Sequence, residues 1–338
     1  MLLIITAAKY LMSLLLMFAI SAVGIAAESL CRPILSVFIR DSVSPRAQSL
    51  MKRLAASYRR KIILPESANM PLSLYGPALS FAALMPVCAA IPFCTLIPIM
   101  ENGADVLQIL QFYMLSEVIA ISTVYSLGTK EAGLAANKCI KESFLVLVPL
   151  VSFIISTAAF FEAGGGSGDA FSLNAFSLSQ KFADLGAGGL TGVIIFIFLI
   201  FTQIPHRDVI DGTLPFDEGE MPAYQGCPRT MLQLRGIFRS FIVIVLVVNM
   251  FFPLGDFALL SGGSYLSWNA QIINFLVFWL VVIFARVVLV NLSWLLFDAI
   301  ERRLPSSVSA FFVPAASLAA AALILHEVYI ISSEIAAF

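Results

Sequence analysis

The sequence predicts an all-α, polytopic membrane protein with about eight transmembrane helices and one amphipathic helix on the cytoplasmic surface. Of its 338 residues, 60% are apolar and only 12% are charged, whereas an ordinary soluble domain is about 25% charged. Apolar stretches recur along the chain, and almost all basic residues fall in alternate loops between them. This composition excludes a water-soluble globule. At about 20 residues per span, a single transmembrane domain occupies the whole chain, 1–338.

Eight stretches are apolar enough to span a membrane over a window of about 19 residues. In chain order they are Leu3–Ala27, Leu74–Ile97, Val106–Leu127, Phe144–Phe161, Leu190–Ile204, Phe241–Leu260, Ile272–Phe297 and Phe311–Ile331. The first stretch contains Lys9 but no basic leader and no small-residue cleavage site. We therefore expect it to be a retained span and not a signal peptide.

The basic residues orient these spans. Of the 20 lysines and arginines, all except Lys9, Lys181 and Arg286 fall in alternate loops or after the seventh span. Loops rich in Lys and Arg stay on the cytoplasmic side of a membrane. We predict a multi-pass protein of the inner or cytoplasmic membrane with both termini outward. The formal net charge of −1 gives no basic excess for binding nucleic acid.

The cytoplasmic segment 43–62 is predicted to form an amphipathic lateral helix. Its apolar residues recur at steps of three and four, while Arg46, Arg53 and Arg59 lie off that stripe. Such a helix lies at the level of the lipid headgroups and is attracted to anionic membrane lipids. Two interpretations stay open: a surface anchor only, or a strut packed against other spans and a docked partner.

The segment 205–240 is predicted to be an acidic cytoplasmic loop. Its acidic residues cluster within 208–220, among Pro and Gly residues that prevent a long regular helix. Composition alone favours a solvated charged loop; the functional alternative is a surface that takes up protons or docks a soluble arm. The candidate docking residues are Arg207, Asp208, Asp211, Phe216, Tyr224, Arg229, Arg235 and Arg239, and the candidate coupling residues are Asp217, Glu218 and Glu220.

Ionisable residues also fall within or beside the predicted spans. Glu117 lies in the third span and Arg286 in the seventh. Because each costs about 2.5–3.5 kcal/mol at the bilayer centre, we expect both to face the bundle interior. Arg286 is a candidate counter-charge for Glu117, or a partner for an acid on another subunit. Glu142, at the mouth of the fourth span, is a further coupling candidate, with a structural snorkelling role as the alternative.

The metal-binding residue types are sparse. The five cysteines are spread singly and there are only two histidines. This spacing matches no zinc, iron–sulfur or haem site. We therefore expect no metal ligand in this chain.

Four short segments carry a resemblance to a known family. They are Leu-Pro-Phe-Asp-Glu-Gly-Glu at 214–220, Ala-Tyr-Gln-Gly at 223–226, Phe-Phe-Pro at 251–253 and Ile-Ile-Leu-Pro-Glu-Ser-Ala at 62–68. With them the chain resembles the membrane subunit of group 4 membrane-bound NiFe hydrogenases of the formate hydrogenlyase and Ech types. That subunit is homologous to respiratory complex I subunit 1 (NADH dehydrogenase subunit 1).

The resemblance implies a non-catalytic subunit of a multisubunit oxidoreductase that binds no cofactor itself, although a quinone stays possible. The iron–sulfur clusters and the NiFe centre are expected in partner subunits. These partners are an iron–sulfur small subunit and a NiFe-hydrogenase-like large subunit on the cytoplasmic side, with antiporter-like subunits in the membrane. The chain would dock this arm and link electron transport to proton or sodium translocation.

The chain also departs from the family pattern. Ala223 stands where the family has the glutamate of Glu-Tyr-Ser-Gly, and the acidic loop is shortened after Glu220. Arg235 and Arg239 lie where the complex I subunit carries an acid, whereas the hydrogenases carry a lysine there and share Phe-Phe-Pro. The sequence thus favours an energy-converting hydrogenase. The alternatives are the quinone-pocket subunit of an NAD(P)H- or ferredoxin-quinone oxidoreductase and, more distantly, a stand-alone secondary transporter.

Overall fold

The computed structural model describes residues 2–39, 50–90, 105–163, 224–251, 276–277 and 279–287. Within these ranges the regular elements are helices, and an isolated bridge joins Ile63 to Gln225. The helices are α1 (Leu2–Ile39), α2 (Leu50–Tyr58), α3 (Met70–Ala82), α4 (Met85–Ala90), α5 (Val106–Tyr125), α6 (Lys130–Ala163) and α11 (Cys227–Phe251), and the described residues of 276–287 are also helical.

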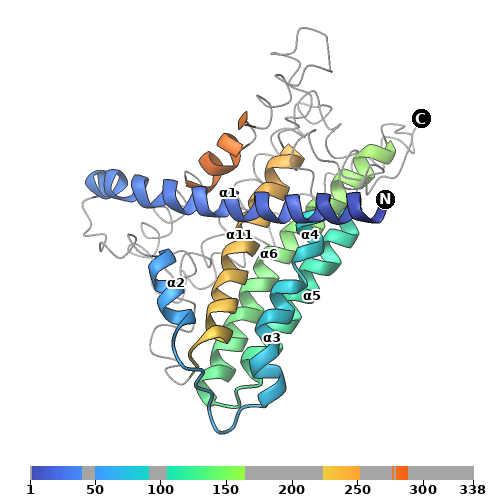
Figure 1. The fold of residues 1–338 in the computed structure, drawn as a ribbon. Helices are drawn as coiled ribbons and strands as arrows, with labels where there is room; N and C mark the ends of the chain where they lie inside the picture. Colours follow the sequence, from blue (N-terminus) through green and yellow to red (C-terminus); the bar gives the residue numbers. More distant parts are fainter. Residues whose placement is uncertain are drawn as a thin grey trace.

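Four helices run side by side, and the first helix crosses them. Figure 1 shows α3, α5, α6 and α11 as neighbours, with α2 along the flank of α11. Helix α1 lies across the upper part of this group and packs on α11 and α4. Among the described residues, the stretches Met70–Val87 and Val106–Tyr125 are long and apolar enough to cross a membrane.

Aromatic side chains hold α1 at its crossing point. The ring of Phe18 lies 4.4 Å from that of Phe238 and 6.3 Å from that of Phe81, centroid to centroid. Phe81 and Phe238 are themselves 5.2 Å apart in an edge-to-face arrangement, a geometry that aromatic rings favour. Farther along α1, Gly24 faces the ring of Phe241 so closely that a Cβ would overlap it. A small residue is therefore required for α1 to approach α11.

Helices α3 and α5 are also packed at close range. Helix α3 begins with Pro71 in its first turn, where the missing N–H is tolerated. Helix α5 is capped by Asp105, whose Oδ1 accepts a hydrogen bond of 2.8 Å from the backbone N–H of Leu107. Between these helices Gly76 faces Thr123, and a Cβ at position 76 would overlap the threonine side chain.

At one end of the bundle three segments meet: residues 62–69, 126–129 and 224–230, which we call the loop junction. The N–H of Gln225 donates to the carbonyl of Ile63 at 3.1 Å, and the N–H of Asn69 donates to the carbonyl of Ser126 at 2.8 Å. Gly226 has φ of 91°, a value that favours glycine. A Cβ there would lie 3.0 Å from the Cα of Ile62, so the absence of a side chain lets the third segment lie against the first.

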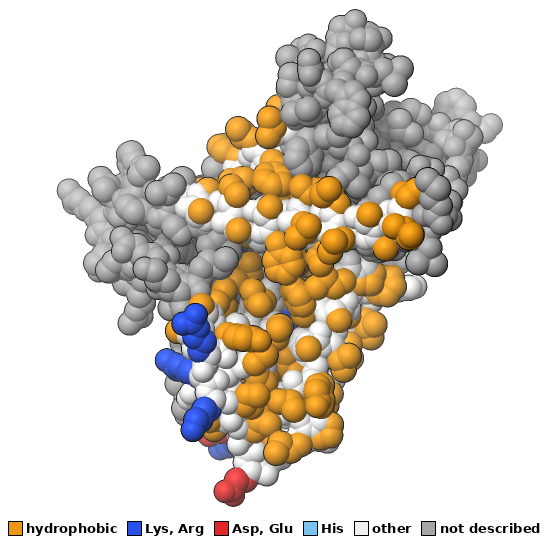
Figure 2. All heavy atoms as spheres, in the orientation of Figure 1, with side chains coloured by type: hydrophobic (Ala, Val, Ile, Leu, Met, Phe, Trp, Pro, Cys, Tyr) orange, Lys and Arg blue, Asp and Glu red, His pale blue; other side chains and the backbone are white. Residues whose placement is uncertain are grey.

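Charged and apolar side chains occupy different parts of the surface. Figure 2 shows hydrophobic side chains over the face formed by α1, α3 and α5. Exposed hydrophobic side chains of these three helices include Ile4, Leu11 and Leu15 on α1, Tyr75 and Leu79 on α3, and Leu115 and Val118 on α5. Exposed Arg59, Arg60, Lys61 and Glu66 lie instead at or beside the loop junction. An apolar belt with charged residues at one end is typical of a membrane protein.

The helix boundaries correct several of the expectations from hydropathy. Helix α5 follows its predicted span closely, but α6 begins at Lys130 and not at Phe144, and α11 begins at Cys227 and not at Phe241. A hydropathy window stops at charged residues, whereas these helices continue through them. Within 43–62 the structure describes α2 over Leu50–Tyr58. The predicted spans 190–204 and 311–331 and the loop 205–223 lie outside the described residues.

Candidate functional site: a buried ion-pair cluster

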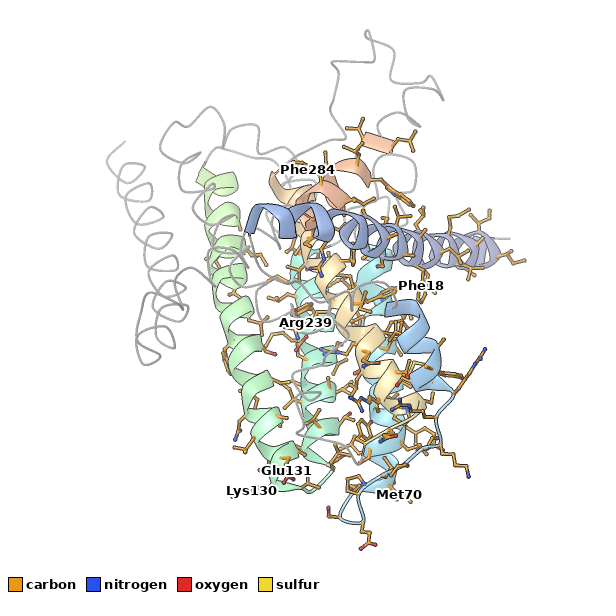
Figure 3. The ribbon with its side chains drawn as sticks, turned by 90° about the vertical axis from the view of Figure 1, so that its left-hand side faces the viewer. Phe18, Met70, Lys130, Glu131, Arg239 and Phe284 are labelled. Atoms are coloured by element: carbon orange, nitrogen blue, oxygen red, sulfur yellow. The ribbon has the colours of Figure 1, made fainter. Side chains whose placement is uncertain are left out.

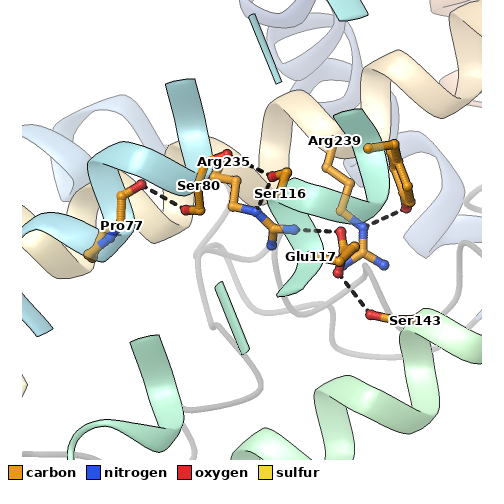
Figure 4. Close-up of polar contacts among 8 residues, drawn as sticks. Pro77, Ser80, Ser116, Glu117, Ser143, Arg235 and Arg239 are labelled. Carbon is orange, nitrogen blue, oxygen red and sulfur yellow. Dashed lines mark hydrogen bonds and ion pairs between the residues drawn. The ribbon is translucent and has the colours of Figure 1, made fainter. Parts of the chain in front are cut away.

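A carboxylate and two guanidinium groups meet in the interior between α5, α6 and α11. Arg235 donates from Nη2 to Oε1 of Glu117 at 2.5 Å, and Arg239 donates from Nη1 to Oε2 at 3.0 Å. The hydroxyl of Ser143 donates to the same Oε2 at 2.8 Å. Figure 4 shows these contacts converging on Glu117. We call Glu117, Ser143, Arg235 and Arg239 the buried cluster.

Helix periodicity brings the two arginines to the same carboxylate. Arg235 and Arg239 are four residues apart on α11, so they occupy one face of the helix, one turn apart. Glu117 is 3% exposed, and Arg235 and Arg239 are 6% and 7% exposed. Figure 3 places Arg239 among the helices, between Met70 at one end of the bundle and Phe284 toward the other. The charges therefore lie within the bundle and away from both of its ends.

Neighbouring hydroxyls orient the arginines. Arg235 also donates from Nε to Oγ of Ser116 at 2.9 Å, and Ser116 in turn donates to the backbone carbonyl of Ser80 on α3 at 2.7 Å. Arg239 donates from Nε to the hydroxyl of Tyr113 at 2.9 Å, and its guanidinium carbon lies 5.8 Å from the centre of the Tyr113 ring. Each guanidinium is thus held in a fixed orientation by two groups of α5.

Such a cluster is stable only when it is complete. Moving an ion out of water costs several kcal/mol even after relaxation, and only good geometry with further hydrogen bonds offsets that cost. Both oxygens of Glu117 accept hydrogen bonds here, from three donors on two helices. The ion pairs therefore fix the register of α11 against α5, and removing Glu117 would leave both guanidinium groups without this counter-charge.

A second polar contact lies where the loop junction meets α3. In a regular helix the carbonyl of Ser73 accepts from the N–H of residue 77, but position 77 is a proline and has no N–H. The hydroxyl of Tyr224 donates to this carbonyl at 2.9 Å. Burial raises the pKa of the Tyr224 phenol above its ordinary value, so the hydroxyl stays protonated and able to donate.

The loop junction is closed by further hydroxyl contacts. Ser67 donates to the carbonyl of Leu127 at 2.9 Å, and the hydroxyls of Ser73 and Ser126 lie 2.8 Å apart. Thr230, in the first turn of α11, donates to the hydroxyl of Ser57 on α2 at 3.0 Å. These contacts tie α2, α3, α5 and α11 together at one end of the bundle.

The structure brings together some of the residues that the sequence singled out. Glu117 faces the interior, and its ion pairs are with Arg235 and Arg239 of α11, while the guanidinium of Arg286 lies 5.3 Å from the ring centre of Phe241. The sequence placed Arg235 and Arg239 on a cytoplasmic loop, and this expectation is wrong. Both lie inside the bundle, because α11 extends through them.

The other candidates are distributed as follows. Tyr224 is buried at the loop junction, Arg229 is partly exposed on the first turn of α11, and Glu142 lies on α6. The candidates of the acidic loop lie outside the described residues: Arg207, Asp208, Asp211, Phe216, Asp217, Glu218 and Glu220. Their docking and coupling roles stay predictions.

Several residues of the site were not anticipated from the sequence. Ser116, Ser143 and Tyr113 all bind members of the buried cluster, but isolated hydroxyl residues in apolar segments give little signal. A signal did exist for the arginines, because two arginines four residues apart directly before an apolar run fit one helix face. Among the described residues, no three His, Cys, Asp or Glu side chains converge as metal ligands would.

Comparison with known proteins gives one relative in sequence. No protein-family model matches the chain. Over 233 residues it is 23% identical to a subunit of NADH-quinone oxidoreductase from Anoxybacillus flavithermus, the counterpart of complex I subunit 1. The match covers 66% of this chain and 67% of that protein.

A solved structure shares the fold along nearly the whole chain. It is a chain of the membrane-bound sulfane sulfur reductase, an archaeal respiratory membrane complex, with a TM-score of 0.57 and 17% identity over 95% of this chain and 99% of that one. This protein is therefore similar in sequence to complex I subunit 1 (NADH dehydrogenase subunit 1), and it shares its fold with a chain of an archaeal respiratory membrane complex.

Proposed function

We propose that this chain is the membrane-anchor and coupling subunit of a complex I-like respiratory complex. In this proposal it spans the membrane eight times with both termini outward, and it docks a soluble redox arm on its cytoplasmic side. Electron transfer in that arm is linked to proton or sodium translocation through the membrane part. The chain itself binds no metal, and the redox centres belong to partner subunits.

One observation supports the proposal most directly. The described parts of two segments that carry the resemblance, 62–68 and 224–226, lie against each other at one end of the bundle. The same loop junction is continuous, through α11, with the buried cluster around Glu117. A partner bound at the junction therefore acts on the helix that carries both arginines of the cluster.

The coupling step in this proposal is electrostatic. A change of charge in the docked arm alters the potential at Asp217, Glu218 and Glu220, which belong to the segment directly preceding Tyr224. In the bundle, Glu117 and its arginines respond, because interactions between charges are stronger in a low-dielectric interior than in water. Glu142 and Arg286 are further candidates for this path.

Two kinds of soluble arm fit this membrane subunit. We favour an energy-converting NiFe hydrogenase, with an iron–sulfur small subunit and a NiFe-type large subunit, on the motifs at 214–220 and 251–253. Alternatively, this chain is the quinone-pocket subunit of a quinone oxidoreductase, whose soluble arm would take the place of the hydrogenase arm. This alternative is supported by the similarity to a subunit of NADH-quinone oxidoreductase.

Purification of the tagged chain from its native membrane in mild detergent tests the docking proposal. We expect an iron–sulfur subunit and a large redox subunit to co-purify, and the large subunit to carry NiFe-type cysteine ligands if the complex is a hydrogenase. A large subunit without these ligands supports the quinone oxidoreductase. A chain that emerges alone or as a homo-oligomer contradicts docking and supports a stand-alone transporter.

Amide substitutions in the acidic loop test the coupling proposal separately. Asp217→Asn and Glu220→Gln should reduce ion translocation by the assembled complex in vesicles while the subunit composition is unchanged. Wild-type translocation in both variants would rule out the role of this loop in coupling and leave docking intact.

A further inference from the structure

Helix α3 has two backbone carbonyls that its own N–H groups do not satisfy, one in its first turn and one in its last turn. The carbonyl of Ser73 loses its regular partner because residue 77 is a proline. At the end of the helix, the N–H of Leu84 donates to Phe81 at 3.0 Å and so is not available to the carbonyl of Ser80. Buried backbone carbonyls are almost always paired, and here the partners come from outside α3.

Two hydroxyls on other segments donate hydrogen bonds to these carbonyls. Tyr224 at the loop junction donates to Ser73 at 2.9 Å, and Ser116 of α5 donates to Ser80 at 2.7 Å. Within α3, the hydroxyl of Ser80 also donates to the carbonyl of Pro77 at 2.8 Å. The segment from Ser73 to Ser80 is thus fixed at one end by the loop junction and at the other by α5.

The second of these hydroxyls belongs to the environment of the buried cluster. Oγ of Ser116 donates to Ser80 and accepts from Nε of Arg235 at 2.9 Å, and the same guanidinium binds Glu117 through Nη2. Because a hydroxyl carries a single hydrogen, its bond to Ser80 leaves a lone pair for Arg235. The position of α3 therefore determines how Arg235 meets Glu117.

Close packing makes this connection stiff. Gly76 lies against Thr123 with no space for a Cβ, so a shift of α3 around Pro77 must be transmitted to α5. Tyr224 is only 2% exposed, and it follows directly after the acidic loop in the chain. A displacement of residues 224–226 at the loop junction would therefore act on the Tyr224 hydroxyl before it reached any member of the buried cluster.

We propose that Tyr224 is a positioning residue that connects the loop junction to the buried cluster. Its hydroxyl replaces the N–H that Pro77 lacks as the donor to the Ser73 carbonyl, and it thereby holds α3 in the position that aligns Arg235 with Glu117. When the hydroxyl leaves Ser73, α3 loses its fixed register at Pro77 and the contact between Ser80, Ser116 and Arg235 loosens. The inference rests on the proposed coupling function, for which it supplies the route from the cytoplasmic loop to the membrane interior.

The test uses the intact complex in vesicles, with electron transfer and ion translocation measured together. Tyr224→Phe removes one hydroxyl and keeps the ring. Loss of one neutral hydrogen bond changes the ratio of aligned to misaligned states by roughly two- to tenfold. We expect Tyr224→Phe to lower the number of ions moved per electron, by up to about tenfold, with subunit composition unchanged. Tyr125→Phe, on an exposed side chain of α5, is the matched control and should behave as wild type.

A second substitution distinguishes positioning from a general structural effect. Pro77→Ala provides an N–H at position 77 that bonds the Ser73 carbonyl without Tyr224. The double variant Tyr224→Phe with Pro77→Ala should therefore recover wild-type coupling, and it should recover assembly if Tyr224→Phe alone impairs it. A wild-type ratio in Tyr224→Phe, or a double variant that recovers nothing, would overturn the proposal.

Glu117→Gln, measured beside these variants, separates the coupling role of the buried cluster from the positioning role of Tyr224. If Glu117→Gln leaves coupling unchanged, the proposed coupling role of the buried cluster fails. If Glu117→Gln lowers coupling and Tyr224→Phe does not, only the positioning role of Tyr224 fails.

Discussion

The two halves of α11 have buried side chains of opposite kinds. In the first half, Thr230, Gln233, Arg235 and Arg239 are at most 8% exposed, and the arginines are bound by groups on α5. In the second half, the buried run from Phe241 to Leu246 is entirely apolar. The comparison shows that a charged helix segment can lie within a membrane bundle when another helix supplies its counter-charge.

The halves also differ in what specifies their neighbours. Apolar burial is non-directional and scales with area, so the run from Phe241 accepts small rearrangements. The ion pairs of Arg235 and Arg239 require particular atoms at particular distances. We infer that the first half sets the register of α11 and the second half supplies bulk stability. Substitutions in each half should separate these two contributions.

The largest effect is expected from removing the carboxylate. Glu117→Ala leaves two buried guanidinium groups without this counter-charge, and breaking a buried pair in this way costs about 3–5 kcal/mol. Equilibrium unfolding in mild detergent measures the change. Glu131→Ala, an exposed acid at the start of α6, is the control and should stay within about 1 kcal/mol of wild type. A similar cost in both variants would contradict the buried cluster.

A smaller effect is expected when the charge is kept but the geometry is changed. Arg235→Lys retains the positive charge, but a single ammonium cannot reproduce the fork that binds Ser116 and Glu117 at once. Losing one charge-assisted hydrogen bond should cost about 1.5–3 kcal/mol in the same unfolding measurement. Unchanged stability would show that only the charge matters in this half of α11, and it would contradict the inference that specific hydrogen bonds set the register of the helix.

The smallest effect belongs to the apolar half. Ile242 is 1% exposed, and Ile242→Val deletes one methylene from a well-packed region, which costs about 0.5–1.5 kcal/mol. Because no specific contact is lost, ion translocation per electron should equal that of wild type. Lowered coupling in this variant would show that the apolar half also takes part in setting register.

The sequence predicted much of the helical architecture and little of the site. The bounds of α5 are predicted well because its apolar run contains no charged residue at either edge, apart from the capping Asp105. The starts of α6 and α11 are predicted poorly. The helices continue through Lys130, Lys141, Arg229 and Arg235, but these charged residues interrupt the hydropathy signal.

The pairing of Glu117 with Arg235 and Arg239 could not be read from the chain. The partners are 118 and 122 residues apart in sequence, so only the packing of α5 against α11 brings them together. The position of Glu117 in the interior was predictable, because an ionised group is too costly to face lipid. The contact of Tyr224 with the Ser73 carbonyl was not predictable, since it depends on a proline in a different helix.

The most direct measurement of the central claim is the number of ions moved per electron in vesicles that contain the complex with Glu117→Gln and Arg235→Gln together. The double substitution removes one charge of each sign, so the net charge of the buried cluster is unchanged, Arg239 keeps its hydrogen bond to Tyr113, and the two costs should not add. The account predicts that electron transfer continues while ions moved per electron fall at least about twofold, since the aligned ion pair of α5 and α11 is lost. A wild-type ratio in an assembled complex would contradict the claim that the buried cluster couples the two processes.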